Sequence, residues 1–576
     1  MTISYTLSQE NPQRQYIQFD AQFQHDGTEF FAVQLPAWRP GRYELGNFAK
    51  NIRGFRVSDE KGNDLPFEKT SKDTWKINGS GQSHINIHYE YYSAELNGGS
   101  TFLDENLIYV NPINCFMYRP GFEEVDNFIV ELKMPKEYKL ASPLCSPEKT
   151  TMVARNVHEL LDSPFMASSS LDHLEFIVKN VKFHIWVNGK HELTLDKIAS
   201  DFIPFCEAQI RDFKDFPQEE YLFLFHFLAQ PSYHGVEHEK CTVITLGPAK
   251  KLLTPLFYEE LLGVSSHELY HTWNVKALRP SDMYPYDYTK ENYSKLGYVY
   301  EGVTTYMGDW YLLNSGVFDF NTYARHLGSY LNRHFQNQGR FNYSVAESSY
   351  DTWLDGYVSG APGRKTSIYT EGCLVAFISD LMIINATEGK ENLASAMSKL
   401  WTDLGSKGLS YKAEDYFNAL EAVSNISFEE IKTKLLYGTE DFRLFLSENL
   451  DFLGLSLKES LNSNPITAHL GIKAIKTSKG NLKITDIHQN SPSDILGVHI
   501  GDEILAVNGI KDFTSELFKE IDFSVSVSIE LNHMEGIQSA LLQPTDRTFF
   551  DNSALTLVKN LSTRQQKLYN HWSGDK

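Results

Sequence analysis

The residues best suited to chemistry are His267, Glu268 and His271, which form an HExxH pattern. Residues four apart on an α-helix lie one turn apart and about 40° apart around its axis, so both imidazoles project from one face. They can then reach one Zn²⁺ at about 2.0–2.1 Å. Glu268 lies beside such a metal rather than on it. Its carboxylate can act as the general base toward a zinc-activated water, whose pKa falls to about 7.

A third ligand separates a catalytic zinc site from a chance pattern. Glu301 follows His271 by thirty positions and begins the helical-looking stretch EGVTTYMGDWYLL. A carboxylate from a second helix completes a site with two His and one Glu, and leaves a fourth position for water. Three competing carboxylates lie nearby: Asp282, Asp287 and Asp309. The helical context and the spacing favour Glu301, so we predict one zinc per chain on His267, His271 and Glu301.

The alternative is that this pattern arises by chance. With 19 His in 576 residues, two His and one Glu at these offsets arise by chance in roughly a few of every hundred such chains. A decayed or purely structural metal site is a further alternative. The third ligand makes zinc-dependent hydrolysis the stronger interpretation.

The chain around this motif changes its periodicity several times. Short alternating runs such as QYIQFDAQFQ and HINIHYEYY predict an N-terminal antiparallel β-sandwich over residues 1–170. Residues 171–450 pass from mixed to helical periodicity and predict a mostly helical catalytic domain. Residues 451–545 become β-rich again, and residues 546–576 are predicted to pack on the body. The fold class is therefore multidomain α+β.

The third region resembles a PDZ domain. Its Ser491-Pro492, Gly497, Gly501-Asp502 and Asn508-Gly509 match the pattern SPAxxAGLxxGDxIxxxNG of that family. The resemblance implies that TSELFKEI forms the helix beside a groove for peptide C-termini.

The overall composition limits which partners the protein can bind and indicates its cellular compartment. A formal charge of -21 disfavours nucleic acid and anionic membranes, because both would be repelled. Five scattered cysteines without a CxxC pair predict reduced thiols rather than a disulfide framework. No signal peptide is visible, and the most apolar stretch, residues 373–386, is too short to span a membrane and contains Asp380. We therefore expect a cytoplasmic protein.

Nearly the whole chain resembles the PDZ-containing glycyl aminopeptidase family of gluzincins, the metallopeptidases of thermolysin-like fold. The matching segments are LPAWRPGRY (35–43) with NFA (47–49), GVEH (235–238), HTWNVK (271–276) with RP (279–280), SYDTW (349–353) and YTEG (369–372). The family's own patterns are LPAWxPGxY, GLEH, HxWNVKRxRP, SFDxW and YxKG. The resemblance implies a thermolysin-like domain between the β-sandwich and the PDZ domain.

The resemblance also implies roles for particular residues. Glu237 would pair with the α-ammonium of a substrate with a free N-terminus, and Tyr369 would donate a hydrogen bond to the developing oxyanion. A solvated strand-edge carboxylate and a merely packed tyrosine are the alternatives for these two. Trp38 and Arg39 are expected to brace the β domain against the cleft. The implied activity is an aminopeptidase for small N-terminal residues, with glycine preferred and alanine possible.

Four positions depart from the family pattern: Glu371 replaces Lys, Cys241 replaces Ser, Tyr298 replaces Trp and Ala277 replaces Arg. None of them removes a predicted ligand or the base, although Glu371 reverses the charge next to Tyr369. Two other functions stay open. One is an endopeptidase on the same scaffold, if Glu237 does not face the amine. The other is an inactive adaptor that binds peptides through its PDZ groove.

Overall fold

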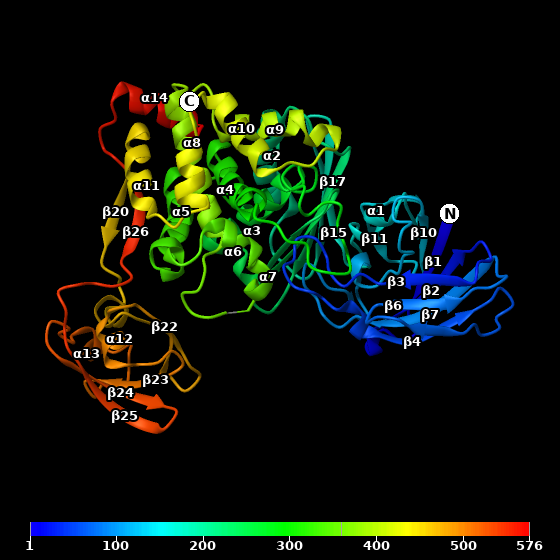
Figure 1. Ribbon diagram of the computed structural model, residues 1–576, viewed down its shortest axis with the longest axis horizontal. Coiled ribbons are helices and arrows are strands. Elements are labelled where there is room, and N and C mark those ends of the chain that lie inside the picture. Colours follow the sequence, from blue (N-terminus) through cyan, green and yellow to red (C-terminus); the bar gives the residue numbers. More distant parts are fainter. Residues whose placement is uncertain (1, 359, 575–576) are drawn as a thin grey trace.

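The computed structural model describes residues 2–358 and 360–574. Figure 1 shows three parts in a row: an N-terminal β-rich part, a central body of helices on a sheet, and a smaller C-terminal β part. The two β-rich parts lie on opposite sides of the body, so each contacts it independently.

The N-terminal part holds three sheets. The largest has the order β12-β13-β10-β1-β2-β7-β4. Its strands are β1 (Thr2–Ser8), β2 (Tyr16–Gln24), β4 (Ile52–Ser58), β7 (His84–Tyr92), β10 (Asn127–Leu132), β12 (Cys145–Glu148) and β13 (Thr151–Ala154). A second sheet contains β3 (Phe30–Gln34), β5 (Phe67–Lys69) and β6 (Thr74–Asn78). A third contains β8 (Phe102–Leu103), β9 (Ile108–Val110), β11 (Lys139–Ala141) and β14 (Phe165–Ser168).

All three sheets contribute to one hydrophobic core, because alternate residues of the strands point inward. The prediction of a purely antiparallel sandwich was wrong in one respect. Strands β1 and β10 pair in parallel, with Tyr5 opposite Val130. The chain passes through the other two sheets between these strands, and this long crossover permits the parallel pairing that a tight hairpin cannot make.

The central body is built on a mixed sheet with the order β15-β16-β17-β19-β18. Its strands are β15 (Asp172–Val178), β16 (Val181–Asn188), β17 (Glu220–Phe227), β18 (Ser232–Glu237) and β19 (Cys241–Gly247). Helix α2 (Leu195–Phe213) connects the parallel pair β16 and β17. Strand β18 forms an edge of the sheet, antiparallel to β19, and Glu237 is its last residue.

Helices cover this sheet and share its core. They are α3 (Pro255–Tyr270), α4 (Thr304–Asn314), α5 (Phe320–Phe335), α6 (Val345–Tyr350), α7 (Thr352–Asp355), α8 (Ile368–Ala386), α9 (Leu393–Asp403), α10 (Ala413–Ser424) and α11 (Phe442–Leu450). The short helix α1 (Val157–Leu161) belongs to the N-terminal part.

Helix α8 is longer than the apolar stretch recognised in the sequence. Among the described residues it is the one helix long and apolar enough to cross a membrane by length and composition, and 83% of its apolar window is buried within the protein. Asp380 is also buried in this helix, where it accepts hydrogen bonds from the Leu393 backbone N–H at 2.7 Å and from the Tyr306 hydroxyl. Helix α8 is thus a core helix of the body.

The C-terminal part has its own core and a sheet with the order β21-β22-β23-β24-β25. Its elements are β21 (Ile472–Lys476), β22 (Leu482–Ile487), α12 (Pro492–Leu496), β23 (Glu503–Val507), α13 (Glu516–Lys519), β24 (Val527–His533) and β25 (Gly536–Leu542). The structure differs from the expected start at residue 451. Strand β20 (Leu455–Ser460) pairs with β26 (Asn552–Leu557), and both add apolar residues to the core of the body.

The chain ends in α14 (Thr563–Ser573), which packs on the body. The Trp572 side chain is fully buried and donates a hydrogen bond to the Tyr306 hydroxyl at 3.0 Å. The Trp310 indole donates to the Trp572 carbonyl at the same distance. Helix α14 is therefore part of the body, as are strands β20 and β26, which lie just before and just after the C-terminal part in the chain.

Candidate active site

The HExxH residues occupy the last turn of α3. His271 caps the helix, and residues 272–277 form turns, so the helix does not extend through the HTWNVK segment. Asn274 lies just beyond the end of the helix: its side-chain amide donates to the Val299 carbonyl at 2.9 Å, and its backbone carbonyl accepts from His271 Nδ1 at 2.7 Å. Because a carbonyl only accepts, Nδ1 carries the proton and Nε2 is free to bind a metal.

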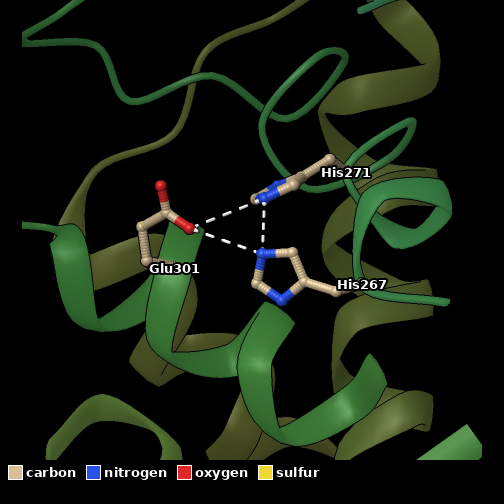
Figure 2. A group of neighbouring side chains, drawn as sticks. All are labelled: His267, His271 and Glu301. Atoms are coloured by element: carbon tan, nitrogen blue, oxygen red, sulfur yellow. Dashed lines mark hydrogen bonds and ion pairs between the residues drawn. The ribbon is translucent and has the colours of Figure 1, made fainter. Parts of the chain in front are cut away.

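Glu301 is presented by a π-helical turn, Tyr298–Val303, that leads into α4. The wider turn is a feature often found at functional sites. Figure 2 shows its carboxylate directed toward both imidazoles. The two Nε2 atoms lie 3.0 Å apart, and Glu301 Oε2 lies 3.7 Å from His267 Nε2 and 3.5 Å from His271 Nε2. Tetrahedral zinc with ligand distances near 2.05 Å needs ligand atoms about 3.3 Å apart. The three side chains fit that geometry.

Charge and burial favour a cation at the centre of this triangle. Burial would raise the pKa of Glu301, but the two imidazoles lower it to about 2. Burial would lower the pKa of His271, but Glu301 together with Glu237 and Glu268 raises it to about 9. Glu301 Oε2 is buried and accepts no hydrogen bond from any described residue. A buried carboxylate oxygen without a donor, next to two imidazole nitrogens, suits a zinc ligand.

Two tyrosines hold the other oxygen of this carboxylate. The Tyr43 hydroxyl donates to Glu301 Oε1 at 2.9 Å and the Tyr369 hydroxyl donates to the same atom at 3.1 Å. Tyr369 comes from the start of α8, whereas Tyr43 comes from the N-terminal part. Sequence reasoning missed Tyr43. It was recognised within the segment LPAWRPGRY, but nothing in that segment indicates that its phenol reaches a residue 258 positions away.

Glu268 lies opposite the edge strand and is buried. A Cβ atom at Gly235 would lie 2.1 Å from Glu268 Oε1, so the glycine of GVEH makes room for this carboxylate. Burial, together with Glu237 and Glu301 nearby, raises the pKa of Glu268 well above its usual range, although His271 opposes the shift. Its Oε2 atom is buried and unpaired among the described residues. A carboxylate in this setting is ready to accept a proton.

Glu237 lies at the same end of the cleft. It is buried, and one side-chain ligand atom each from Glu237, Glu268 and His271 lie within 4.8 Å of one another. The loop before Tyr43 closes over it: Gly41 has φ +79°, and a Cβ there would lie 2.5 Å from a Glu237 carboxylate oxygen. The structure therefore brings Glu237, Glu268, Tyr369 and the three candidate ligands together in one cleft.

The cleft has a volume of about 630 Å³, in the range of ligand-binding sites. Away from Glu237 it is lined by Tyr233, Phe257, Asp309, His326 and Arg333. Burial, reinforced by Glu260, raises the pKa of Asp309 to about 6, although His326 opposes it. None of the competing carboxylates named above joins the triangle among the described residues: Asp309 only lines the cleft, and Asp287 binds Thr289.

Glu371 does not reverse the charge around Tyr369 as its sequence position suggested. Its buried carboxylate turns to the ring of buried His334 and to the Thr366 hydroxyl. His334 in turn stacks on Phe442, with ring centroids 4.4 Å apart. The side chain is thus satisfied inside the body. Of the other departures, Cys241 and Tyr298 are both buried.

A buried ion cluster connects the N-terminal part to the cleft. Asp162 follows α1 and accepts hydrogen bonds from Lys276 Nζ at 2.8 Å and His238 Nδ1 at 3.0 Å. Lys276 and His238 belong to the WNVK and GVEH segments, next to candidate site residues. Burial would raise the pKa of Asp162, but Lys276 and His238 lower it well below its usual range. Burial likewise opposes the charge on Lys276, but Asp162 raises its pKa.

We expect Lys276→Met to lower the free energy of unfolding by about 3 kcal/mol, because the Asp162 carboxylate would remain between the N-terminal part and the body without its main partner. The depressed pKa of Asp162 stabilises the fold above the unfolded value near 3.9, so the loss should persist at neutral pH and shrink as the pH falls below about 4. Urea unfolding at pH 7 and pH 3 measures both effects. An equal loss at the two pH values would contradict the ion-pair explanation.

Comparison with known proteins identifies relatives of both larger parts. Residues 4–169 match the Peptidase M61 N-terminal domain, and residues 260–375 match the M61 glycyl aminopeptidase family. An aminopeptidase N family protein from Idiomarina loihiensis superposes with a TM-score of 0.90 at 24% identity over 99% of each chain. An M1 zinc metallopeptidase from Deinococcus radiodurans gives a TM-score of 0.48 at 12% identity, over 77% of this chain and 94% of its own. No curated protein matches the chain.

Proposed function

The chain belongs to the M61 family of zinc metallo-aminopeptidases, and we propose that it removes small N-terminal residues from peptides, glycine first and alanine second. The observation that best supports this proposal is the position of Glu237: one of its carboxylate oxygens lies within 4.8 Å of a side-chain ligand atom of Glu268 and of His271. A carboxylate so near the candidate base leaves room for about one residue between a bound α-ammonium and the scissile bond. That spacing favours an exopeptidase.

The residues divide the chemistry as follows. His267, His271 and Glu301 would hold one zinc per chain, and zinc, when bound, supplies the Lewis acidity that activates water and polarises the carbonyl. Glu268 takes the proton of the attacking water and delivers it to the leaving amine. Glu237 neutralises the substrate ammonium, and Tyr369 turns its phenol hydrogen from Glu301 Oε1 to the carbonyl oxygen as negative charge develops there.

The amine anchor can be tested directly. Glu237→Ala should lose at least about 30-fold in kcat/KM on Gly-anilide, because a desolvated ammonium loses its partner. The wild type should refuse N-acetyl-Gly-anilide. The matched control is Glu239→Ala, which removes a carboxylate two positions further along the chain, just after β18, that instead accepts a hydrogen bond from Gln218 at 3.0 Å. Equal cleavage of blocked and free substrates by the wild type would make the protein an endopeptidase and remove Glu237 from amine recognition.

The two tyrosines on Glu301 form a matched pair. Both Tyr43→Phe and Tyr369→Phe remove one hydrogen bond from Glu301 Oε1 and should weaken metal affinity by about 10-fold or more. Only Tyr369→Phe should also lower kcat by about 10²-fold under saturating zinc, because that phenol is proposed to serve the transition state. Zinc titration and kinetics at saturating metal separate the effects. Equal kcat values for the two variants would reduce Tyr369 to a residue that orients Glu301.

The C-terminal part is proposed to be a PDZ domain that binds peptide C-termini. Two glycines of the motif have backbone conformations that favour glycine, with φ +79° at Gly497 and +101° at Gly501, which supports the resemblance. Helix α13 spans only Glu516–Lys519, shorter than the predicted TSELFKEI. A reducing, cytoplasmic compartment is also proposed, since all five cysteines are free and four are buried.

A further inference from the structure

A second cavity lies beside the cleft, in the N-terminal part. Its volume is about 300 Å³, and its wall contains Arg39 and Arg42. These residues flank Pro40 and Gly41 in the loop that closes over Glu237. They occupy the two variable positions of the segment LPAWxPGxY, so the family pattern assigns them no role.

Arg39 is a buried cation without a direct partner among the described residues, and one charged group that it influences is the Glu268 carboxylate, whose pKa it lowers against the raising effect of burial. Arg39 is only 3% exposed, yet its guanidinium makes no ion pair or hydrogen bond with any other residue that the structure describes. The guanidinium lies against Gly99, where a Cβ atom would come within 2.2 Å of Arg39 Nη2. A guanidinium has five N–H donors, and burying it without acceptors is costly. An acceptor that is not part of the chain would remove this cost.

Arg42 extends the positive wall toward the cleft. It pairs with Glu44, and its guanidinium carbon lies 5.1 Å from the ring centroid of Tyr357, which lines the active-site cleft. Its Nε atom is buried and has no partner among the described residues. The other charged residues of the cavity wall are Lys50, Glu44 and Glu95. Three cations face two carboxylates there, a positive excess in a chain of net charge -21.

The position of the loop relates this cavity to the amine end of the cleft. A Cβ atom on Gly41 would lie 2.5 Å from a Glu237 carboxylate oxygen, and Arg39 and Arg42 lie two positions before Gly41 and one position after it. His234 is a cleft residue on β18. Its burial, together with the positive charges of Arg39 and Arg42, lowers its pKa to about 3. The arginines therefore act electrostatically on the side of the cleft where the N-terminal residue of a substrate would lie.

We propose that Arg39 and Arg42 form a carboxylate-binding site next to Glu237, which takes either the acidic side chain of an N-terminal Asp or Glu residue or a free small carboxylate. Paired guanidinium donors suit a carboxylate, which accepts several hydrogen bonds at once. The first source rests on the proposed aminopeptidase function and widens its specificity beyond glycine and alanine. The second source does not depend on that function. The proposal also gives Arg39 a role beyond the bracing expected from the sequence.

The test compares the wild type with Arg39→Met, Arg42→Gln and the control Arg56→Gln, an exposed arginine on β4 of the same part. The first measurement is the ratio of kcat/KM on Glu-anilide to that on the neutral isostere Gln-anilide. If the site takes the substrate side chain, the wild-type ratio should be at least about 10 and should fall to near 1 in both cavity variants. The control should keep the wild-type ratio.

The second measurement is glutarate binding, by calorimetry and by the shift in melting temperature. If the site takes a free carboxylate, the wild type and Arg56→Gln should bind one glutarate per chain, and the two cavity variants should bind at least about 10-fold more weakly. Because Arg39→Met changes a buried residue, circular dichroism must show that it is folded; Arg42→Gln, which is only half-buried, carries the test if it is not. A ratio near 1 together with no glutarate binding would overturn the proposal. Glutarate binding without any peptidase activity would instead overturn the proposed function alone.

Discussion

Glu268→Gln is expected to lower kcat by at least about 10²-fold and to leave zinc binding intact. The amide nearly preserves the shape of the carboxylate but cannot accept the proton of the attacking water. Among the described residues, the Glu268 side chain forms no hydrogen bond or ion pair with the three candidate ligands, and its Oε2 atom is unpaired. Its replacement should therefore disturb the chemistry and not the metal site.

The measurements are single-turnover and steady-state kinetics on Gly-anilide, with zinc content determined on the same preparations. Asp309→Asn is the matched control, since it also converts a cleft carboxylate with a raised pKa into an amide. It should retain most of the wild-type kcat. Unchanged turnover in Glu268→Gln would remove Glu268 from proton transfer. Loss of zinc in this variant would make it a ligand instead.

The part of the site that could be predicted is the part encoded by local spacing. A helix places His267 and His271 on one face whatever surrounds it, and a second helical segment offered Glu301. Local reasoning did not anticipate the π-helical turn that carries Glu301, nor the end of α3 at Tyr270; the two meet where Asn274 binds the Val299 carbonyl. That hydrogen bond connects two segments which the sequence alone does not bring together.

The contacts between the N-terminal part and the body could not be predicted from the sequence either. Tyr43 reaches Glu301 from a loop of the β-rich part, and Asp162 reaches Lys276 from the end of α1. Period-two alternation predicted the β strands of that part but not the parallel pairing of β1 with β10. Glu371 shows the same limit at one residue: its sequence neighbour is Tyr369, but its partner in space is His334. The N-terminal part therefore contributes a hydrogen bond to a candidate ligand as well as contacts that brace the cleft.

Glu301→Ala is expected to abolish both zinc binding and peptidase activity, and His267→Ala should do the same. Two remaining protein ligands cannot hold a catalytic zinc tightly. The triangle would also lose the carboxylate whose Oε2 atom lies 3.7 and 3.5 Å from the two imidazoles. Without that negative charge, the imidazoles have less to offset the cost of bringing a dication into a buried site. Chelation of the wild type should have the same effect, and activity should return when zinc is added back.

Zinc content after dialysis, measured by elemental analysis, decides this prediction without any assay of activity. Asp282→Ala is the control, because it removes an alternative carboxylate that the structure leaves outside the triangle. It should retain about one zinc per chain. Full occupancy in Glu301→Ala would mean that another carboxylate is the third ligand. Glu237 would then be the first candidate, because it joins Glu268 and His271 within 4.8 Å. Zinc binding by Glu237 would in turn leave no carboxylate for the substrate amine, so the same measurement also tests the basis of the proposed exopeptidase activity.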